Sequence, residues 1–257
     1  MQPGEHALMS EVEEDHWWYR GLRDAVARSL RIGHLAPPPH PRVLDAGCGT
    51  GENLRFLGDL LHPSYIGGFD SAAEAVAVAR KKAERADVYQ SDICDPLVHA
   101  DDLDLLLSLD VICIPGATRA LGGLRRLVAR LRRGGLLILN LPAHDWLYSE
   151  HDAAVHTSQR FTSCEVACLL DALGLSVELL SHRLFFLFPA IVLSRLTSIR
   201  RARQGRASQE ARSDLHSMPG KRVNRILFGI LRAENQLIAR GVRFPWGSSV
   251  FAIGRKI

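Results

Sequence analysis

The segment "VLDAGCGTG" at residues 43–51 combines an apolar run, a carboxylate at Asp45 and three glycines spaced G-x-G-x-G. The backbone N–H groups of such a turn, together with the N-terminus of a following helix, can approach a nucleotide-like ligand closely. The dinucleotide fingerprint is spaced differently, G-x-G-x-x-G, and a carboxylate two residues before the first glycine would repel a pyrophosphate. Asp45 would instead attract an amino group. The loop therefore indicates a ligand with an amine and no phosphate.

Two further carboxylates end the next two strand-like runs of the sequence. Asp70 follows the glycines by about 20 residues, a distance at which an acid can bind both ribose hydroxyls. Asp92 ends the following run. Each has a structural alternative, because Asp70 could cap a helix that begins at Ser71 and Asp92 could be a turn residue. Taken with Asp45, the two carboxylates favour S-adenosylmethionine (SAM), which carries an amine and a ribose but no phosphate.

The motif "VLDAGCGTG" resembles the first motif of the class I, seven-stranded, Rossmann-like SAM-dependent methyltransferases, and the resemblance extends from Asp45 to Arg255. It implies an N-terminal helix over the cofactor, with Arg20 meeting the cofactor's carboxylate, although its aromatic residues could equally pack the helix onto the sheet. It also implies that Asp92 meets the adenine amino group and that Asp110 faces the methyl-transfer site. The cofactor-binding residues expected from the motif and the resemblance are Tyr19, Arg20, Asp45, Ala46, Gly47, Cys48, Gly49, Gly51, Asp70, Ser71, Asp92, Ile93 and Asp110.

The polar segment 143–161, "AHDWLYSEHDAAVHTSQRF", supplies candidates for a general base. Transfer from a sulfonium mainly requires alignment, and a base is needed only for nucleophiles that are protonated at working pH. The candidate catalytic residues are His144, His151, Asp152 and His156, with Asp152 orienting His151 or His156. A solvated loop is an equal alternative. Zinc or iron is conceivable, but the spacing matches no ligand pattern, so no metal site is expected.

The layout of this segment resembles a bacterial subfamily of these methyltransferases found with antibiotic and surface-glycan pathways. Gln159, Arg160 and Phe161 stand where Arg, Arg and Tyr are usual. The departure weakens any transfer of acceptor contacts from that subfamily to this chain.

Apolar strand-like runs that alternate with helical patterns must position these residues. They predict an α/β, doubly wound, mostly parallel seven-stranded sheet with an N-terminal helical cap and a two-helix insertion before the last strand. Strands are expected at 42–46, 65–69, 88–90, 103–109, 136–141, 176–182 and within 248–257. Helices are expected at 12–35, 52–61, 71–85, 119–132, 163–173, 184–203 and 221–239.

We expect one domain over 1–257, with a cap and linker at 1–41, a SAM-binding core at 42–183, a helical insertion or lid at 184–243 and the last strand at 244–257. The apolar stretch that begins at Leu184 is too short to span a bilayer. It suits a buried helix or an apolar lid for a lipid-like or polyketide acceptor. The arginine-rich stretch 195–212 is usually a solvated joint.

Composition and charge add little to the choice among these functions. The net charge of +4 arises from 28 arginines and 4 lysines against 28 acids, which is weak evidence for a nucleic-acid partner. Five scattered cysteines argue against a disulfide framework and favour a reducing cytoplasm, and the acidic N-terminus lacks the layout of a signal peptide.

The sequence thus favours a cytoplasmic SAM-dependent methyltransferase that acts at O, N or C of a small, secondary-metabolite acceptor. Two alternatives stay open: a SAM-binding protein that does not methylate, such as a regulator or cyclase, and a nucleic-acid methyltransferase. The fourth strand-like run ends in "LDVICIPG", without the Asn/Asp-Pro-Pro-aromatic motif used on base amines, which counts against the second. A NAD-dependent oxidoreductase is disfavoured by the loop spacing.

Overall fold

A computed structural model describes residues 5–114, 116–149, 152–153, 156–203 and 219–257. Its seven strands form one sheet in the order β3-β2-β1-β4-β5-β7-β6. All neighbours pair in parallel except β7, which runs antiparallel to both β5 and β6. The strands are β1 (Arg42–Ala46), β2 (Tyr65–Asp70), β3 (Asp87–Gln90), β4 (Leu103–Leu109), β5 (Leu131–Pro142), β6 (Leu175–Arg183) and β7 (Ser249–Lys256).

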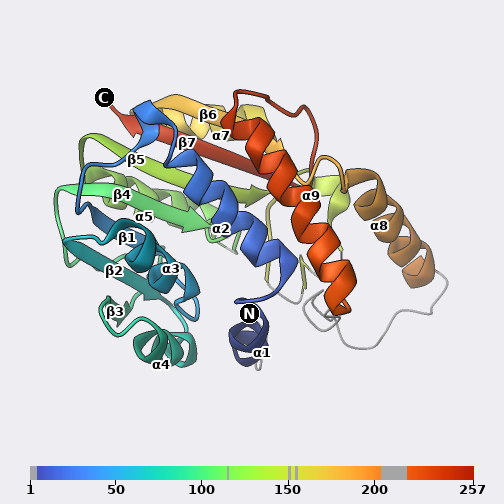
Figure 1. Ribbon diagram of the computed structural model, residues 1–257, viewed down its shortest axis with the longest axis horizontal. Helices are drawn as coiled ribbons and strands as arrows, with labels where there is room; N and C mark the ends of the chain where they lie inside the picture. The colour runs from blue at the N-terminus through green and yellow to red at the C-terminus, as the bar shows by residue number, and fades with distance from the viewer. Residues whose placement is uncertain (1–4, 115, 150–151, 154–155, 204–218) are drawn as a thin grey trace.

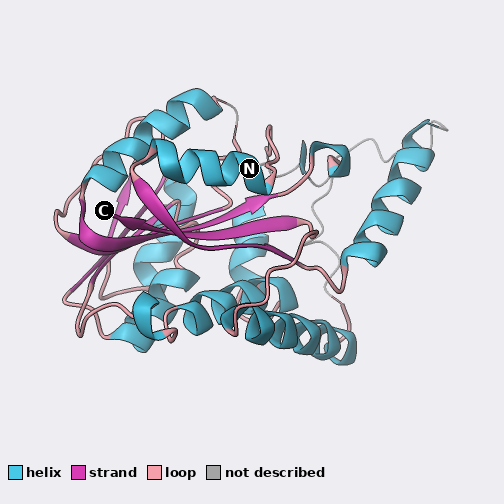
Figure 2. Cartoon of the chain, turned by 90° about the horizontal axis from the view of Figure 1, so that it is seen from above, coloured by secondary structure: helices cyan, strands magenta, loops and turns pink. Residues whose placement is uncertain are grey.

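Helices cover both faces of this sheet, which lies between them in Figure 2. Buried side chains of α2, α3, α4 and α9 pack on one face, and those of α5 and α7 pack on the other. This confirms the predicted doubly wound α/β architecture. The helices are α1 (Glu5–Val12), α2 (Trp17–Ser29), α3 (Glu52–Leu61), α4 (Ala73–Lys82), α5 (Ala117–Ala129), α7 (Ser163–Ala172), α8 (Phe188–Arg203) and α9 (Lys221–Ala239), with short 3-10 turns η1 (Gly33–Leu35) and η2 (Asp145–Leu147).

The central strands are apolar on both sides because both of their faces are covered. In β4, Leu105 and Leu107 face the α3 side while Leu106 faces the α5 side, and all three are at most 1% exposed. Because successive side chains of a central strand are buried on opposite faces, polar residues are accommodated mainly at the strand ends.

The N-terminal region differs from the prediction of one helix over 12–35. The structure contains two helices, α1 and α2, separated by a turn at residues 13–16. His16 is extended (φ −63°, ψ 130°) and caps α2 by accepting a hydrogen bond from the N–H of Trp18. A capping imidazole satisfies an N–H that the first turn of a helix leaves without a partner, so the helical pattern is interrupted there.

The predicted strand at 136–141 was too short, since β5 begins at Leu131, immediately after α5. The helical insertion consists of α8 and α9, between β6 and β7. Figure 1 shows α9 lying beside α2, while α8 stands at the edge of the molecule, away from the sheet. No helix in the described part of the chain is both long and apolar enough to cross a membrane.

Candidate functional site

A cavity of about 650 Å³ lies at the carboxyl ends of β1, β2 and β4. This is the edge at which the strand order reverses between β1 and β4, where open α/β sheets bind their ligands. Residues predicted for the cofactor form one wall of it. Those that line the cavity are Tyr19, Gly47, Cys48, Gly49, Asp70, Ser71, Ile93 and Asp110.

The glycine loop after β1 folds tightly against the end of β2. The N–H groups of Gly47 and Cys48 both donate to the carbonyl of Phe69 at 2.8 Å. Gly47 has φ +86°, and a Cβ there would lie 2.3 Å from the Val111 side chain, so only glycine fits. The glycine loop after β1 therefore packs directly on Val111, which follows β4, and both line the cavity.

Gly51 packs the glycine loop against α4. It is the N-cap of α3 at φ +89°, and a Cβ on it would lie 2.8 Å from Cα of Ala79 in α4. Gly51 does not line the cavity, and neither does Ala46, which is fully buried in the core. The structure therefore gives these two residues packing roles, and their contact with a cofactor stays a prediction.

Asp70 ties the glycine loop to α4 at the cavity wall. Its Oδ2 accepts a hydrogen bond from the N–H of Gly49 at 3.0 Å, and its Oδ1 accepts one from the N–H of Ala72 at 2.9 Å. Each carboxylate oxygen can accept a second hydrogen bond. The N-cap of α4 is Ala72, so Asp70 forms a turn just before the helix rather than capping it, and it keeps acceptor capacity on the cavity wall.

Asp45 is 0% exposed and does not line the cavity. Neither of its carboxylate oxygens has a hydrogen-bond partner within the described residues. Burial raises the pKa of Asp45 to about 7, the neighbouring Asn53 side chain offsets part of this rise, and the charge of Asp70 adds to it. Asp45 therefore lies behind the loop, where contact with a ligand amine stays a prediction.

In the segment after β3, the residues on either side of Asp92 line the cavity, and Asp92 itself does not. Asp92 is exposed and uses Oδ1 to accept the N–H of Cys94 at 2.8 Å, which is a turn of the kind considered from the sequence. Ser91 and Ile93 on either side line the cavity. Ile93 is 4% exposed, so this wall is apolar and suits a flat ring.

Asp110 follows β4 with φ +59° and lies at the cavity wall. Its Oδ2 accepts a hydrogen bond from Nδ2 of Asn140 at 2.8 Å, and its N–H donates to the carbonyl of Asn140 at 2.8 Å. Burial raises the pKa of Asp110 to about 6, while Asn140, Arg183 and Arg160 act in the opposite direction. A carboxylate with one free oxygen thus faces the cavity.

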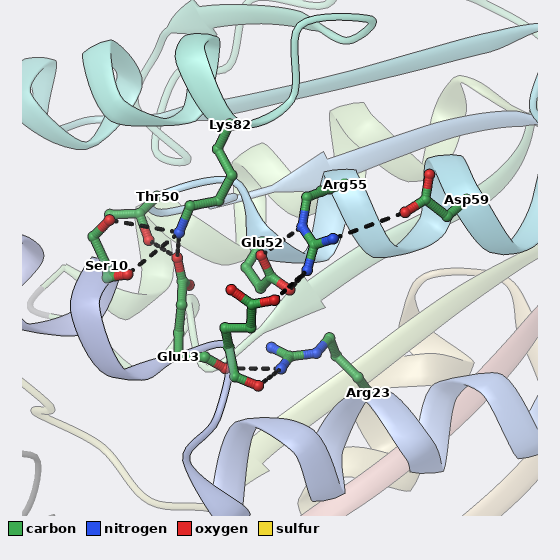
Figure 3. Close-up of polar contacts among 9 residues, drawn as sticks. Ser10, Glu13, Arg23, Thr50, Glu52, Arg55, Asp59 and Lys82 are labelled. Carbon is green, nitrogen blue, oxygen red and sulfur yellow. Dashed lines mark hydrogen bonds and ion pairs between the residues drawn. The ribbon is translucent and has the colours of Figure 1, made fainter.

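The N-terminal segment reaches the cavity wall at Glu13, whose polar contacts with the glycine loop and α4 are drawn in Figure 3. Glu13 is 5% exposed, and its Oε1 accepts hydrogen bonds from Oγ1 of Thr50 in the glycine loop and from Nζ of Lys82 in α4. Arg23 donates to the carbonyls of Glu13 and Glu14. The turn at 13–16 is thereby held over the glycine loop.

Three consecutive aromatic residues, Trp17, Trp18 and Tyr19, all line the cavity, and Trp18 and Tyr19 pack edge to face with centroids 5.0 Å apart. Arg20 does not join them. Its guanidinium lies 4.1 Å from the centre of the Phe228 ring of α9. The structure therefore places Arg20 in the packing of α2 against α9, and its contact with a cofactor carboxylate stays a prediction.

In the 143–161 segment, Asp152 does not have the partner expected for a residue that orients a histidine base. Asp152 is 1% exposed and pairs with Arg160 rather than with a histidine. His144 has φ +62° and stacks on His182 with ring centres 5.3 Å apart. Burial lowers the pKa of His144. His156 is exposed, and neither His144 nor His156 lines the cavity. His151 lies outside the described residues.

Sequence reasoning missed several residues that line the cavity. They are Glu13, His16, Asn53, Cys113, Thr157, Arg160 and Arg195. Glu13 and His16 belong to a stretch whose pattern predicts one continuous helix. Their polar side chains were the one signal in the sequence that the helix is interrupted there. Within the described residues no group of three His, Cys, Asp or Glu side chains is placed to hold a metal ion.

Residues 43–135 match a protein family described as "Methyltransferase domain". Trans-aconitate 2-methyltransferase of Acidovorax sp. is 31% identical over 144 residues, which cover 55% of this chain and 51% of that protein. The enzyme of that name from Deinococcus radiodurans is 33% identical over 141 residues, 54% of this chain and 49% of that protein. The chain therefore spans about half the length of these curated relatives.

Solved structures share the fold over the whole chain. The plantazolicin methyltransferase BpumL in complex with S-adenosylhomocysteine (SAH) has a TM-score of 0.59 at 16% identity, covering 100% of this chain and 91% of that one. A methyltransferase in complex with the Trm112 activator of Haloferax volcanii has a TM-score of 0.58 at 18% identity, covering 98% and 92%. Residues 43–135 of this chain are thus similar to a methyltransferase domain, and the whole chain shares the fold of these solved methyltransferases.

Proposed function

We propose that this protein is a SAM-dependent methyltransferase that acts on a small molecule. The observation that carries the proposal is the junction of Asp70 with the glycine loop, where one carboxylate holds the N–H of Gly49 and keeps acceptor capacity on the cavity wall. A ribose at Asp70 would place the adenine toward Ile93 and the methionine part along Gly47 and Asp110. The carboxyl ends of three strands then hold a single extended ligand.

The remaining cavity wall supports an acceptor with an apolar part. Leu147, Leu184 and Ile191 line it, together with the aromatic residues of α2. Arg195 also lines this side, so an acidic group on the acceptor is compatible with the site. The names of the trans-aconitate methyltransferases point to carboxylic acids as one acceptor class to test, beside the secondary metabolites favoured by the sequence.

Methyl transfer from a sulfonium breaks the S–CH₃ bond and forms a bond between the methyl carbon and the acceptor. The chain's part is to align the two groups and exclude water, which the closed N-terminal turn and the aromatic wall are built to do. Since His144 and His156 lie off the cavity, we assign no base to these two histidines. The five free cysteines support a reducing compartment such as the cytoplasm.

Isothermal titration calorimetry with SAM tests the assignment. We expect binding by the full chain and a loss of at least about tenfold in affinity for Asp70→Ala, because a ribose-binding carboxylate is removed. Asp87→Ala is the matched control: it removes a carboxylate at the other end of the neighbouring strand, where Asp87 contacts His99 and Tyr65. No heat with the wild type would reject the proposal.

Two other functions predict different outcomes. A SAM-binding protein that does not methylate would bind SAM yet form no SAH with any of the carboxylic acids or metabolites supplied. A nucleic-acid methyltransferase would transfer labelled methyl groups to bulk RNA or DNA in a salt-sensitive manner. SAH formation with a small acceptor, and none with nucleic acid, is the outcome that supports the present proposal.

A further inference from the structure

The helical insertion formed by α8 and α9 is far more basic than the rest of the chain. Residues 184–203 and 219–233 contain eight arginine and lysine residues and no aspartate or glutamate. All other residues together carry 24 basic side chains and 28 acidic ones. The positive net charge of the protein therefore comes from this one region, and the remainder of the chain is slightly acidic.

The first half of α8 is apolar on every side, since residues 188–193 are FPAIVL. A helix with apolar residues all round is normally covered by other elements. In Figure 1, α8 instead stands at the edge of the molecule. Ile191 and Arg195, one turn apart, line the cavity, whereas Leu193 is 64% exposed. One side of α8 thus faces the cavity, and another carries an uncovered leucine.

The first turns of α9 present aliphatic and basic side chains together. Ile226 is 63% exposed, and Arg222, Val223 and Arg225 are also exposed. Residues three and four positions apart are neighbours on a helix surface, so Ile226 lies next to both Arg222 and Val223. α8 and this end of α9 lie at the same end of the molecule, to the right in Figure 1. The two helices therefore expose apolar and basic groups in one region.

Exposed aromatic side chains lie where α8 begins. Trp146 of η2 is 55% exposed and packs edge to face on Phe188, the first residue of α8, with ring centres 6.0 Å apart. Tyr148 is also exposed, and Leu147 between them lines the cavity. Tryptophan and tyrosine are enriched where one end of the side chain meets water and the other an apolar phase. Aromatic residues of this kind thus flank the cavity wall beside α8.

We propose that α8, the first turns of α9, Trp146 and Tyr148 form a docking surface for an anionic lipid bilayer. The basic side chains would meet the anionic headgroups, and the exposed aliphatic and aromatic side chains would enter the apolar boundary beneath them. The protein would then lie on the bilayer without crossing it.

Two other partners fit this surface less well. Nucleic acid is bound mainly through phosphate contacts and aromatic stacking, in which exposed residues such as Leu193 and Ile226 have little part. A second copy of the chain would bring two basic surfaces without acidic residues against each other, and like charges repel. A bilayer satisfies both the charge and the exposed apolar side chains.

Docking on a bilayer does not require methyl transfer, but its consequence for catalysis rests on the proposed function. Because Ile191 and Arg195 line the cavity, α8 would lie between the cavity and the lipid. This arrangement suits an acceptor whose apolar part dissolves in the bilayer.

Co-sedimentation of the full chain with lipid vesicles, in the absence of SAM, tests the surface. We expect binding to vesicles that contain phosphatidylglycerol, and at least about tenfold weaker binding to pure phosphatidylcholine or at high salt. The double variant Arg222→Glu/Arg225→Glu should weaken binding at least about tenfold, because two attractive charges become repulsive. Leu193→Ser should weaken it about fivefold or more, because less apolar surface is removed from water.

Leu97→Ser and the double variant Arg125→Glu/Arg126→Glu are the matched controls. Leu97 is 59% exposed and follows β3, at the other edge of the sheet from β6. Arg125 and Arg126 are exposed on α5, which packs on the opposite face of the sheet from α9. Both controls should bind vesicles as tightly as the wild type. An unchanged melting temperature shows that Leu193→Ser has kept its fold.

Each other outcome has a definite meaning. A wild type that binds neither kind of vesicle refutes the proposal, and so do equal losses in the docking and control variants. Binding of labelled RNA without binding of vesicles would assign the basic region to nucleic acid instead. A dimer that Leu193→Ser converts to a monomer, without vesicle binding, would show that a second copy covers α8. SAM binding is measured separately, so failure of the proposed function is distinguished from failure of the docking surface.

Discussion

Arg160 and Asp152 form a buried, bidentate ion pair on the cavity wall. NH2 of Arg160 lies 2.7 Å from Oδ1 and 2.9 Å from Oδ2 of Asp152, and NH1 donates to the carbonyl of Ala143 at 2.8 Å. Asp152 also accepts the N–H and hydroxyl of Ser149. The pair fastens the 143–161 segment to the end of β5. Asp152 is therefore committed to shaping the cavity rather than to orienting a histidine.

Arg160→Met should destabilise the protein by roughly 3–5 kcal/mol, because it leaves Asp152 buried without its cation. Urea unfolding followed by circular dichroism measures the change. Arg130→Met is the control, since the Arg130–Asp101 pair is exposed at 47% and 67%. An exposed pair contributes less than about 1 kcal/mol. Equal losses in the two variants would contradict a structural role for the buried pair.

Glu13→Gln should loosen the N-terminal turn from the glycine loop. The neutral amide loses the ion pair with Lys82 and weakens the bond to Thr50, interactions that involve a charged partner and contribute roughly 1.5–3 kcal/mol. Hydrogen exchange of residues 5–16 should accelerate about tenfold or more, and SAM affinity should decrease. Glu14→Gln is the control, because the Glu14 side chain is 71% exposed. Unchanged exchange in Glu13→Gln would show that the turn is held by other contacts.

Gly51→Ala should destabilise the fold by roughly 1–3 kcal/mol, because the residue keeps φ +89° and its Cβ would meet the backbone of Ala79. Gly229→Ala provides the opposite expectation. Gly229 is in the interior of α9 with open space around it, so alanine should stabilise by roughly 0.5–1 kcal/mol. Thermal unfolding should show a lower melting temperature for Gly51→Ala and a higher one for Gly229→Ala. Tolerance of alanine at position 51 would mean that the loop can move away from α4.

Asp45→Asn should be more stable than the wild type at neutral pH, in a pH-dependent manner. Burial raises the pKa of Asp45 from 3.8 to about 7, so between those values the folded state holds a proton that the unfolded state releases. Stability of the wild type is therefore lost as the pH rises through this window. Asparagine cannot ionise, and its advantage should grow from about pH 4 to pH 7 by up to about 4 kcal/mol. Chemical unfolding across this range measures it, and a flat difference would be inconsistent with a buried, unpartnered Asp45.

Local sequence was sufficient for most of the sheet and its helices. The runs 42–46, 52–61, 103–109 and 221–239 were predicted with the bounds that the structure shows. Apolar runs and helical periodicity are properties of neighbouring residues, and turns with glycine interrupt them at defined positions. The same reasoning placed Gly47, Gly49, Asp70 and Asp110 at strand ends, which is why these residues meet at one cavity.

Only the tertiary structure decided what the other polar side chains contact. Arg20 packs on Phe228, Asp152 pairs with Arg160, and Glu13 contacts both Thr50 and Lys82, which lie 37 and 69 residues away in the chain. A carboxylate or guanidinium has the same local pattern whether it binds a ligand or a distant side chain. Burial and partner geometry distinguish the two, and both arise only when the elements pack.

The division between the two kinds of information is physical. The sequence by itself determined the order of strands and helices and the type of ligand that the glycine loop admits, since these depend on spacing along a few residues. The structure decided which side chains keep a free oxygen toward the cavity, because that depends on every neighbour at once. Asp110 is the clearest case: its position could be predicted, but the hydrogen bonds that link it through Asn140 to Arg183 join three strands of the sheet.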